Sequence, residues 1–110
     1  MVKKRVYSKY AQDAACLIGQ QIKLARKNKK WTSANLAQRA GITRETLQRI
    51  ESGDMKSSIG LVFEVATIVG VALFEEDKQH ISNNLELIQT KIELLPKRIR
   101  NQKKVVDDDF

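Results

Sequence analysis

The sequence has very few of the residues that build catalytic and metal sites. It contains one cysteine, Cys16, and one histidine, His80, which lie far apart. This pair cannot build a tetrahedral nitrogen–sulfur metal site, and a lone cysteine cannot form an intramolecular disulfide. Cys16 has no base near it, and its alanine and aliphatic neighbours predict a packing position. We therefore expect no enzyme activity, no metal and no cofactor.

Residues that interrupt helices are scarce as well. The 110 residues include one proline and five glycines, and long stretches are rich in Leu, Ala, Gln, Lys and Arg. This composition favours helix nearly throughout, so we expect an all-α fold with no sheet of consequence. A chain of this length has room for one compact domain with an appendage.

No hydrophobic run is long enough to cross a membrane. The longest covers residues 61–74 and is interrupted by Glu64, Thr67 and Gly70. No secretory signal precedes it. We expect a cytoplasmic protein with no membrane partner.

Acidic residues are outnumbered by basic ones. The chain has 20 Lys and Arg against 13 Asp and Glu, which gives a net charge of +7. A basic protein suits a polyanionic partner, because each phosphate that a Lys or Arg contacts releases condensed counterions. Nucleic acid is the first candidate, and an anionic membrane surface is the second.

Helical spacing of apolar residues predicts five helices. Thr32 and Thr43 are predicted N-caps of the second and third helices, Ser58 is the predicted N-cap of the fourth, and Gly53 and Gly70 are predicted helix ends. The predicted helices cover residues 10–29, 33–40, 44–52, 59–69 and 75–95.

The second and third predicted helices have the spacing of a helix-turn-helix. Ala37 is small where the two axes must approach, and Gly41 suits the backbone of a tight turn. The residues predicted to face the core are Leu36, Ala40, Ile42, Leu47 and Ile50. The third helix then leaves a polar face that suits the base edges of DNA. An ordinary α-hairpin inside a bundle is the alternative interpretation.

From residue 18 to 74 the chain resembles the XRE family of helix-turn-helix regulators, in the run from Leu36 through Gly41 to Gly53. The resemblance implies a lambda-repressor-like bundle that binds double-stranded DNA. The predicted base contacts are Arg44, Glu45, Thr46 and Arg49. The predicted phosphate contacts are Thr32, Ser33, Thr43, Gln48 and Lys56. Ser33 departs from the family, which usually has Gln there. The resemblance also implies an ion pair between Arg26 and Glu51.

Beyond residue 74, apolar residues recur at steps of four and three, which is typical of a helical dimer seam. The seam residues are Ile81, Leu85, Ile88, Ile92 and Leu95. One recognition helix reads only a few base pairs, so we expect a homodimer on a palindromic operator. Packing of the seam onto its own subunit is the alternative.

The ends of the chain have no apolar periodicity. We expect residues 1–9 to form a flexible basic arm and residues 96–110 to form a flexible tail that is basic and then acidic. Between them, we expect residues 10–74 to form the DNA-binding domain and residues 75–95 to form the dimerisation helix.

Residues 73–77, residues 94–100 and the closing Asp-Asp-Phe resemble antitoxins of the HipB type. This resemblance implies a repressor of its own toxin–antitoxin operon that binds a HipA-like serine/threonine kinase toxin, with or without a further small subunit. A stand-alone phage-type or restriction-modification controller repressor shares every feature up to Phe74. An adaptor that no longer contacts DNA is a third alternative.

Overall fold

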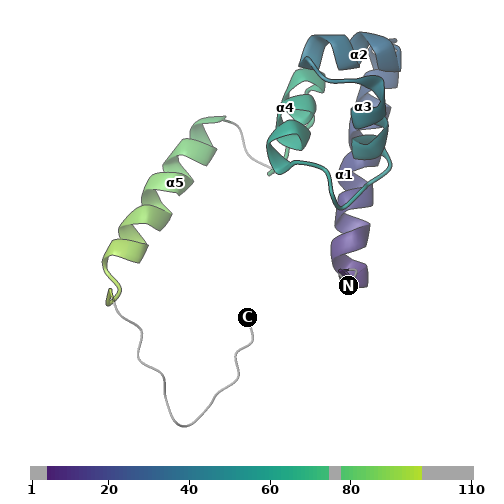
Figure 1. Ribbon diagram of the computed structural model, residues 1–110. Coiled ribbons are helices and arrows are strands. Elements are labelled where there is room, and N and C mark those ends of the chain that lie inside the picture. The colour runs from purple at the N-terminus through teal and green to yellow at the C-terminus, as the bar shows by residue number, and fades with distance from the viewer. Residues whose placement is uncertain (1–4, 75–77, 98–110) are drawn as a thin grey trace. The chain divides into compact units, whose positions relative to one another are not determined.

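The computed structural model describes residues 5–74 and 78–97, and these residues form five α-helices and no strand. The helices are α1 (Lys9–Asn28), α2 (Ser33–Ala40), α3 (Arg44–Glu51), α4 (Ile59–Val69) and α5 (Lys78–Glu93). Figure 1 shows α1 to α4 gathered into one bundle. The predicted all-α, lambda-repressor-like class is confirmed.

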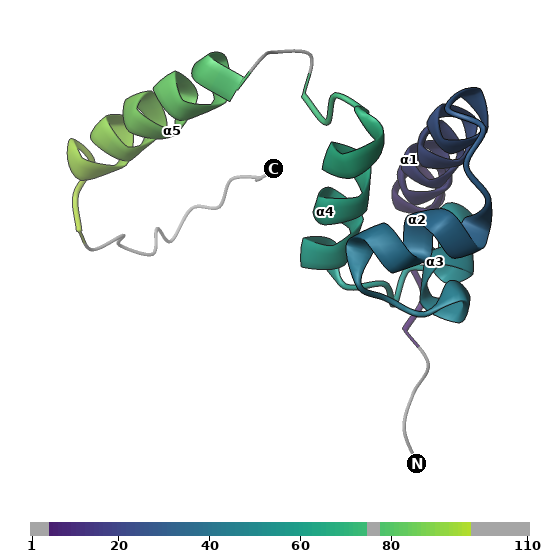
Figure 2. The ribbon, with the colours of Figure 1, turned by 90° about the horizontal axis from the view of Figure 1, so that it is seen from above.

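Each helix of the bundle contributes one large aliphatic side chain with no solvent exposure. These side chains are Ile22, Leu36, Leu47 and Val65, from α1, α2, α3 and α4 in turn. Burying one such side chain stabilises a fold by about 1.5–3 kcal/mol. The remaining residues predicted to face the core are buried or packed against it. Four amphipathic helices thus share one core, and Figure 2 shows these helices from above.

Three of the four bundle helices begin with a side-chain cap. Ser8, Thr32 and Thr43 each accept a hydrogen bond from a backbone amide three residues later. Ser58 occupies the N-cap position of α4 but makes no side-chain cap hydrogen bond, so the predicted cap at Ser58 is wrong in that respect. Its hydroxyl therefore contributes nothing of the ~1 kcal/mol that a cap provides.

Helices α1 and α3 touch through their backbones. A Cβ atom placed on Gly19 would lie 2.5 Å from the carbonyl oxygen of Ile50. Gly53 has a φ of +82°, and a Cβ there would lie 2.8 Å from Cα of Cys16. No side chain fits at either position, so two glycines fix the distance between α1 and the end of α3.

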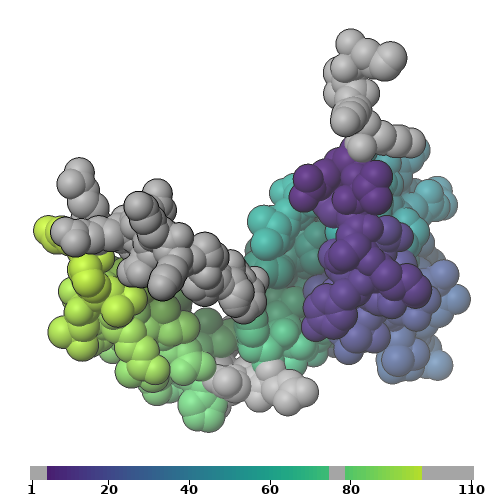
Figure 3. Space-filling view, turned by 90° about the horizontal axis from the view of Figure 1, so that it is seen from below, coloured from purple at the N-terminus to yellow at the C-terminus, as the bar shows by residue number. Residues whose placement is uncertain are grey.

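Cys16 is exposed, and the prediction of a packing position for it is wrong. Its sulfur faces the loop after α3, 3.9 Å from the carbonyl oxygen of Ser52. The first half of α1 lies at the surface of the molecule, as the space-filling view in Figure 3 shows. The apolar neighbours of Cys16 therefore belong partly to an exposed section of the helix.

The chain divides into two compact units, residues 1–75 and residues 76–110. Helix α5 belongs to the second unit and ends at Glu93, so Leu95 lies beyond the helix that was predicted to contain it. None of the helices in the described ranges is long and apolar enough to cross a membrane. The predictions for residues 1–4, for the junction 75–77 and for the tail from residue 98 lie outside the described residues.

Candidate nucleic-acid interface

The turn between α2 and α3 is rigid because its backbone groups are satisfied. Gly41 ends α2 in the left-handed conformation, with a φ of 70°, and its amide donates to Ala37 and Gln38. The amide of Ile42 donates to the carbonyl of Ala37 over 3.0 Å. Ala37 is buried, so the small residue lies where the two helices meet. This geometry fixes the direction in which α3 leaves the turn.

Two threonine hydroxyls order the first turn of α3. The Thr43 hydroxyl oxygen accepts from the Thr46 amide at 3.1 Å, and its hydrogen is donated to the Thr46 hydroxyl at 2.9 Å. Thr46 therefore accepts one hydrogen bond and keeps its own hydroxyl hydrogen for another acceptor. Thr46 is the partly buried member of the predicted base-contact set, and its remaining donor sits at the start of α3.

The remaining predicted readers share the exposed side of α3. Arg44, Glu45 and Arg49 are exposed, as is the predicted phosphate contact Gln48, while Leu47 and Ile50 are buried. Within the described ranges, the side chains of Arg44 and Arg49 form no hydrogen bond and no ion pair. Two guanidinium groups are thus free to bind an external acceptor.

At the start of α2, the predicted phosphate contact Thr32 uses its polar groups within the helix itself. Thr32 and Asn35 form a capping box, and the Thr32 hydroxyl both accepts from the Asn35 amide at 3.0 Å and donates to its side-chain oxygen at 3.0 Å. The Thr32 hydroxyl hydrogen is therefore already used. Ser33 is partly exposed beside it and makes no side-chain hydrogen bond in the part of the chain that the structure describes.

Lys56 lies in the loop between α3 and α4. The carboxylate of Asp54 accepts the Lys56 amide at 2.8 Å, which shapes this loop, and the lysine side chain is exposed. Asp54 itself is tied to α3 because its amide donates to the carbonyl of Arg49. Lys56 therefore extends from a loop that is fixed to the end of α3.

A buried guanidinium joins α1 to the end of α3. Nε of Arg26 lies 2.9 Å from one carboxylate oxygen of Glu51, and Nη2 lies 3.1 Å from the other. Both side chains are 8% exposed. The third nitrogen, Nη1, donates to the backbone carbonyl of Trp31 at 3.0 Å. A paired and fully hydrogen-bonded ion pair of this kind is costly to break, because the remaining charge stays buried.

Two residues of this region went unnoticed in the sequence. The guanidinium carbon of Arg39 lies 4.0 Å from the centre of the Trp31 ring, and Nζ of Lys29 lies 5.3 Å from it. Trp31 is partly buried just before α2 and packs against the core. The basic run around residue 29 was the available signal, but spacing alone does not show that a cation 10 residues further along shares the same ring.

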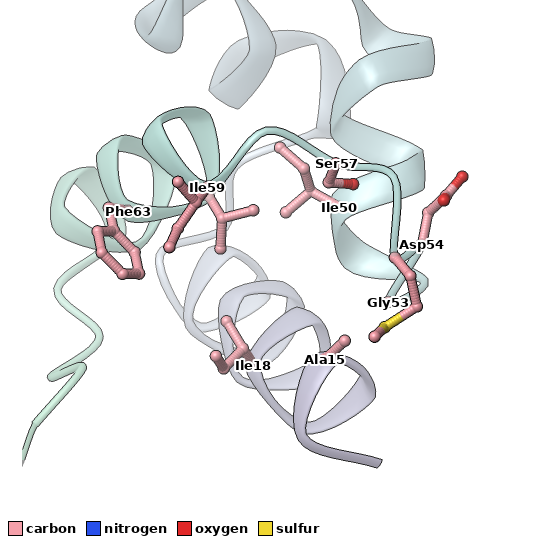
Figure 4. Close-up of a pocket in the computed structure, with 10 residues that line it drawn as sticks. Ala15, Ile18, Ile50, Gly53, Asp54, Ser57, Ile59 and Phe63 are labelled. Atoms are coloured by element: carbon pink, nitrogen blue, oxygen red, sulfur yellow. The ribbon is translucent and has the colours of Figure 1, made fainter. Parts of the chain in front are cut away.

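An apolar groove of about 330 Å³ lies at the side of the bundle. Figure 4 shows Ala15 and Ile18 of α1 facing Ile59 and Phe63 of α4 across it. Among the described residues that line it, Asp54 alone is acidic or basic, so these residues supply no pair of groups for acid–base chemistry. No three potential metal-ligand side chains gather anywhere in residues 5–74 and 78–97.

The predicted seam residues on α5 are mostly exposed. Leu85, Ile88 and Ile92 are 66%, 56% and 56% exposed, and Ile81 is partly buried. Leu95 is exposed too, just beyond the end of the helix. An apolar row of this kind is available to a partner helix.

The sequence model of the helix-turn-helix family matches residues 22–75. These residues contain the turn, the exposed face of α3 and most of the core described above. They are a helix-turn-helix domain of the XRE type. The chain therefore carries the fold of DNA-binding regulators of this type, and the predicted XRE resemblance is confirmed.

Solved structures of HipB have a similar fold. HipB in complex with the 20mer O4 has a TM-score of 0.50 and 20% identity, over 69% of this chain and 99% of that chain. The same values hold for the HipA–HipB–O2–O3 complex. A HipB variant with the 20mer O2 has a TM-score of 0.50 and 21% identity, over 70% of this chain and 99% of that chain. No curated protein sequence matches the chain.

Proposed function

We propose that this XRE-type protein is a sequence-specific DNA-binding repressor and an antitoxin. In this proposal it represses its own toxin–antitoxin operon and binds a HipA-like serine/threonine kinase toxin, alone or with a further small subunit. It acts on the chromosome, in the cytoplasm, and it is not itself an enzyme.

The exposed face of α3 is the observation that carries the DNA-binding part. Arg44 and Arg49 are unpaired within the described residues, while the other side of the helix is buried. A guanidinium fits the two acceptors of guanine in the major groove, and a good bidentate contact contributes about 1–3 kcal/mol of discrimination. Base readers from this face are Arg44, Glu45, Thr46 and Arg49.

Contacts to the DNA backbone would then position α3. Thr43 caps α3, Gln48 lies on its exposed side, Lys56 lies in the loop after it, and Ser33 lies at the start of α2. The hydroxyl and the backbone amide of Thr32 both bond to the Asn35 side-chain oxygen, so a phosphate contact at Thr32 would have to share these donors. Phosphate contacts of this kind set the register of a protein on the duplex but carry no sequence information.

A homodimer explains how so short a helix selects one site. Eight-residue α3 spans little of the groove, so two copies on a palindromic operator would double the number of bases read. The exposed apolar row on α5 supplies a surface for the second copy.

The antitoxin part is supported by the likeness of the fold to HipB, both on a DNA 20mer and in a complex with HipA. The C-terminal residues 105–110 are the segment that we propose for the kinase, on the basis of their acidic and aromatic composition. A stand-alone phage-type or restriction-modification controller repressor would need everything up to Phe74 and no kinase.

Binding to DNA tests the first part. The full chain is titrated against a duplex from upstream of its own reading frame and against a scrambled duplex of equal length. We expect tighter binding to the upstream duplex, by a factor that persists across salt concentrations. Equal affinity for the two duplexes would contradict sequence-specific repression.

Co-purification tests the second part. The full chain and a chain that ends at residue 104 are each co-expressed with the kinase encoded by the adjacent reading frame. We expect the full chain to hold the kinase and the shortened chain to hold less, while both bind the upstream duplex equally. Equal kinase binding by the two chains would contradict the role of the tail. The absence of any complex, or of any such reading frame, would favour the stand-alone repressor.

A further inference from the structure

We propose that Lys29, Trp31 and Arg39 form a second, sequence-independent contact with the phosphates of duplex DNA, next to α3. We call this group the Trp31 platform. The inference rests on the proposed function and adds a set of backbone contacts that it does not contain.

The platform lies in a region with no compensating negative charge. Between Asp13 and Glu45 the sequence has no acidic residue and seven basic ones, which are Lys23, Arg26, Lys27, Lys29, Lys30, Arg39 and Arg44. Arg26 is neutralised by Glu51. Lys29 and Arg39 form no ion pair with any residue that the structure describes. Their charges are therefore available to an external anion.

Two like charges converge on one aromatic ring at this place. Arg39 lies 4.0 Å and Lys29 5.3 Å from the centre of the Trp31 ring. Both charges thus lie within one Debye length, about 10 Å at 0.1 M salt, so their mutual repulsion is only partly screened. Attraction to the ring face offsets part of that cost. A phosphate beside the two cations would remove the rest.

The backbone at the platform also favours a fixed shape. Lys30 has a φ of 62°, in the left-handed region that glycine adopts at least cost. A lysine occupies this strained position, between Lys29 and Trp31. The turn between α1 and α2 thus contains two successive cations, Lys29 and Lys30, followed by the Trp31 ring.

Arg26 ties the platform to the recognition helix. One nitrogen of its guanidinium holds the carbonyl of Trp31, and the other two hold Glu51, the last residue of α3. The platform and α3 are therefore separated by a single buried side chain. When α3 lies in a major groove, the flanking sugar–phosphate backbone runs beside the domain. A basic surface held at constant distance from α3 suits those phosphates.

The test measures how affinity depends on salt. Lys29→Gln and Arg39→Gln each remove one charge, and Lys23→Gln removes one exposed charge from α1 as the matched control. Affinity for the upstream duplex and for the scrambled duplex is measured from low to physiological salt. Thermal melting shows that each variant is folded.

We expect each platform variant to reduce the slope of log affinity against log salt by about 0.9 per bound chain, on both duplexes. The ratio of the two affinities stays as in the wild type, because phosphate contacts carry no sequence information. Arg39→Lys keeps the positive charge and should therefore keep most of the wild-type salt slope. Lys23→Gln leaves the slope close to that of the wild type.

Unchanged slopes in both platform variants would overturn the inference, as would an equal loss of slope in Lys23→Gln, which would show an effect of net charge alone. In either case the wild type still prefers the upstream duplex, so the proposed function stands. A wild type without that preference contradicts the proposed function instead, and its salt slope still reports on the platform.

Discussion

The α1–α4 bundle and helix α5 place their apolar side chains in opposite ways. In the bundle, each helix directs an aliphatic side chain into one closed core, and the largest of these have no exposure. On α5, the apolar row Leu85, Ile88 and Ile92 is more than half exposed. The bundle thus has a buried core of its own, although side chains such as Leu24 and Ile59 stay exposed, whereas the apolar row of α5 is left for another surface to cover. Substitutions in the bundle should therefore change its stability, and substitutions on α5 should change association.

The largest effect on the bundle is expected at the buried ion pair. Glu51→Ala leaves the Arg26 guanidinium buried without its carboxylate, which costs about 3–5 kcal/mol of unfolding free energy. Urea unfolding followed by circular dichroism measures it. The double variant Arg26→Met with Glu51→Leu is the control, because it removes both charges and should recover most of the loss. An unchanged urea midpoint in Glu51→Ala would contradict a structural role for the pair.

A somewhat smaller loss is expected where α1 meets α3. Gly19→Ala places a Cβ 2.5 Å from the carbonyl oxygen of Ile50, so the helices must separate, at a cost of about 3 kcal/mol. Gly60→Ala is the matched control. Its Cβ would meet nothing closer than 3.8 Å, and the higher helix propensity of Ala should stabilise α4 by up to ~1 kcal/mol. Relative to the wild type, the melting temperature should fall in Gly19→Ala and rise in Gly60→Ala. A Gly19→Ala variant as stable as the wild type would show that α1 and α3 can separate at little cost.

A modest effect is expected at the cap of α3. Thr43→Ala removes the hydrogen bond to the Thr46 amide and should cost about 1 kcal/mol. Ser58→Ala is the control, because Ser58 makes no side-chain cap bond at the start of α4 and its loss should be close to zero. The same urea titration compares the unfolding free energies of the two variants. Equal losses of stability in Thr43→Ala and Ser58→Ala would contradict a stabilising role for the Thr43 cap hydrogen bond.

The smallest effect on the bundle is expected from α5. Ile88→Asp should leave the unfolding of the bundle unchanged while it weakens dimerisation, because a charge replaces an exposed apolar side chain in the seam. Thr90→Asp introduces the same charge at another exposed position of α5 and should leave the dimer intact. Sedimentation equilibrium reads the oligomeric state. A dimer that persists in Ile88→Asp would assign dimerisation to another surface.

The sequence predicted the helices and the core of the bundle well because both depend on local signals. Helical periodicity, the threonine caps at Thr32 and Thr43 and the turn at Gly41 each involve residues within a few positions of one another. Contacts between distant residues were less visible. The close approach of Gly19 to α3 and the stacking of Arg39 on Trp31 depend on how the helices cross, which periodicity does not specify.

The candidate site was likewise predictable in outline and not in detail. The polar face of α3 follows from the burial of Leu47 and Ile50 on its other side. Spacing could not show that the Thr32 hydroxyl is used by Asn35, since Ser, Thr and Asn side chains choose among several nearby backbone partners. At Cys16 the apolar neighbours were misleading, because the side chain faces the loop after α3 and remains exposed.

The central claim is that the exposed face of α3 reads bases, and the ratio of two dissociation constants tests it most directly. The ratio compares the upstream duplex with the scrambled duplex, for the wild type, Arg44→Ala, Arg49→Ala and the exposed control Lys56→Ala. We predict that at least one arginine variant loses about ten-fold or more of the preference, equivalent to ~1–3 kcal/mol, while Lys56→Ala keeps it. Arginine variants that bind both duplexes more weakly by the same factor would contradict the account.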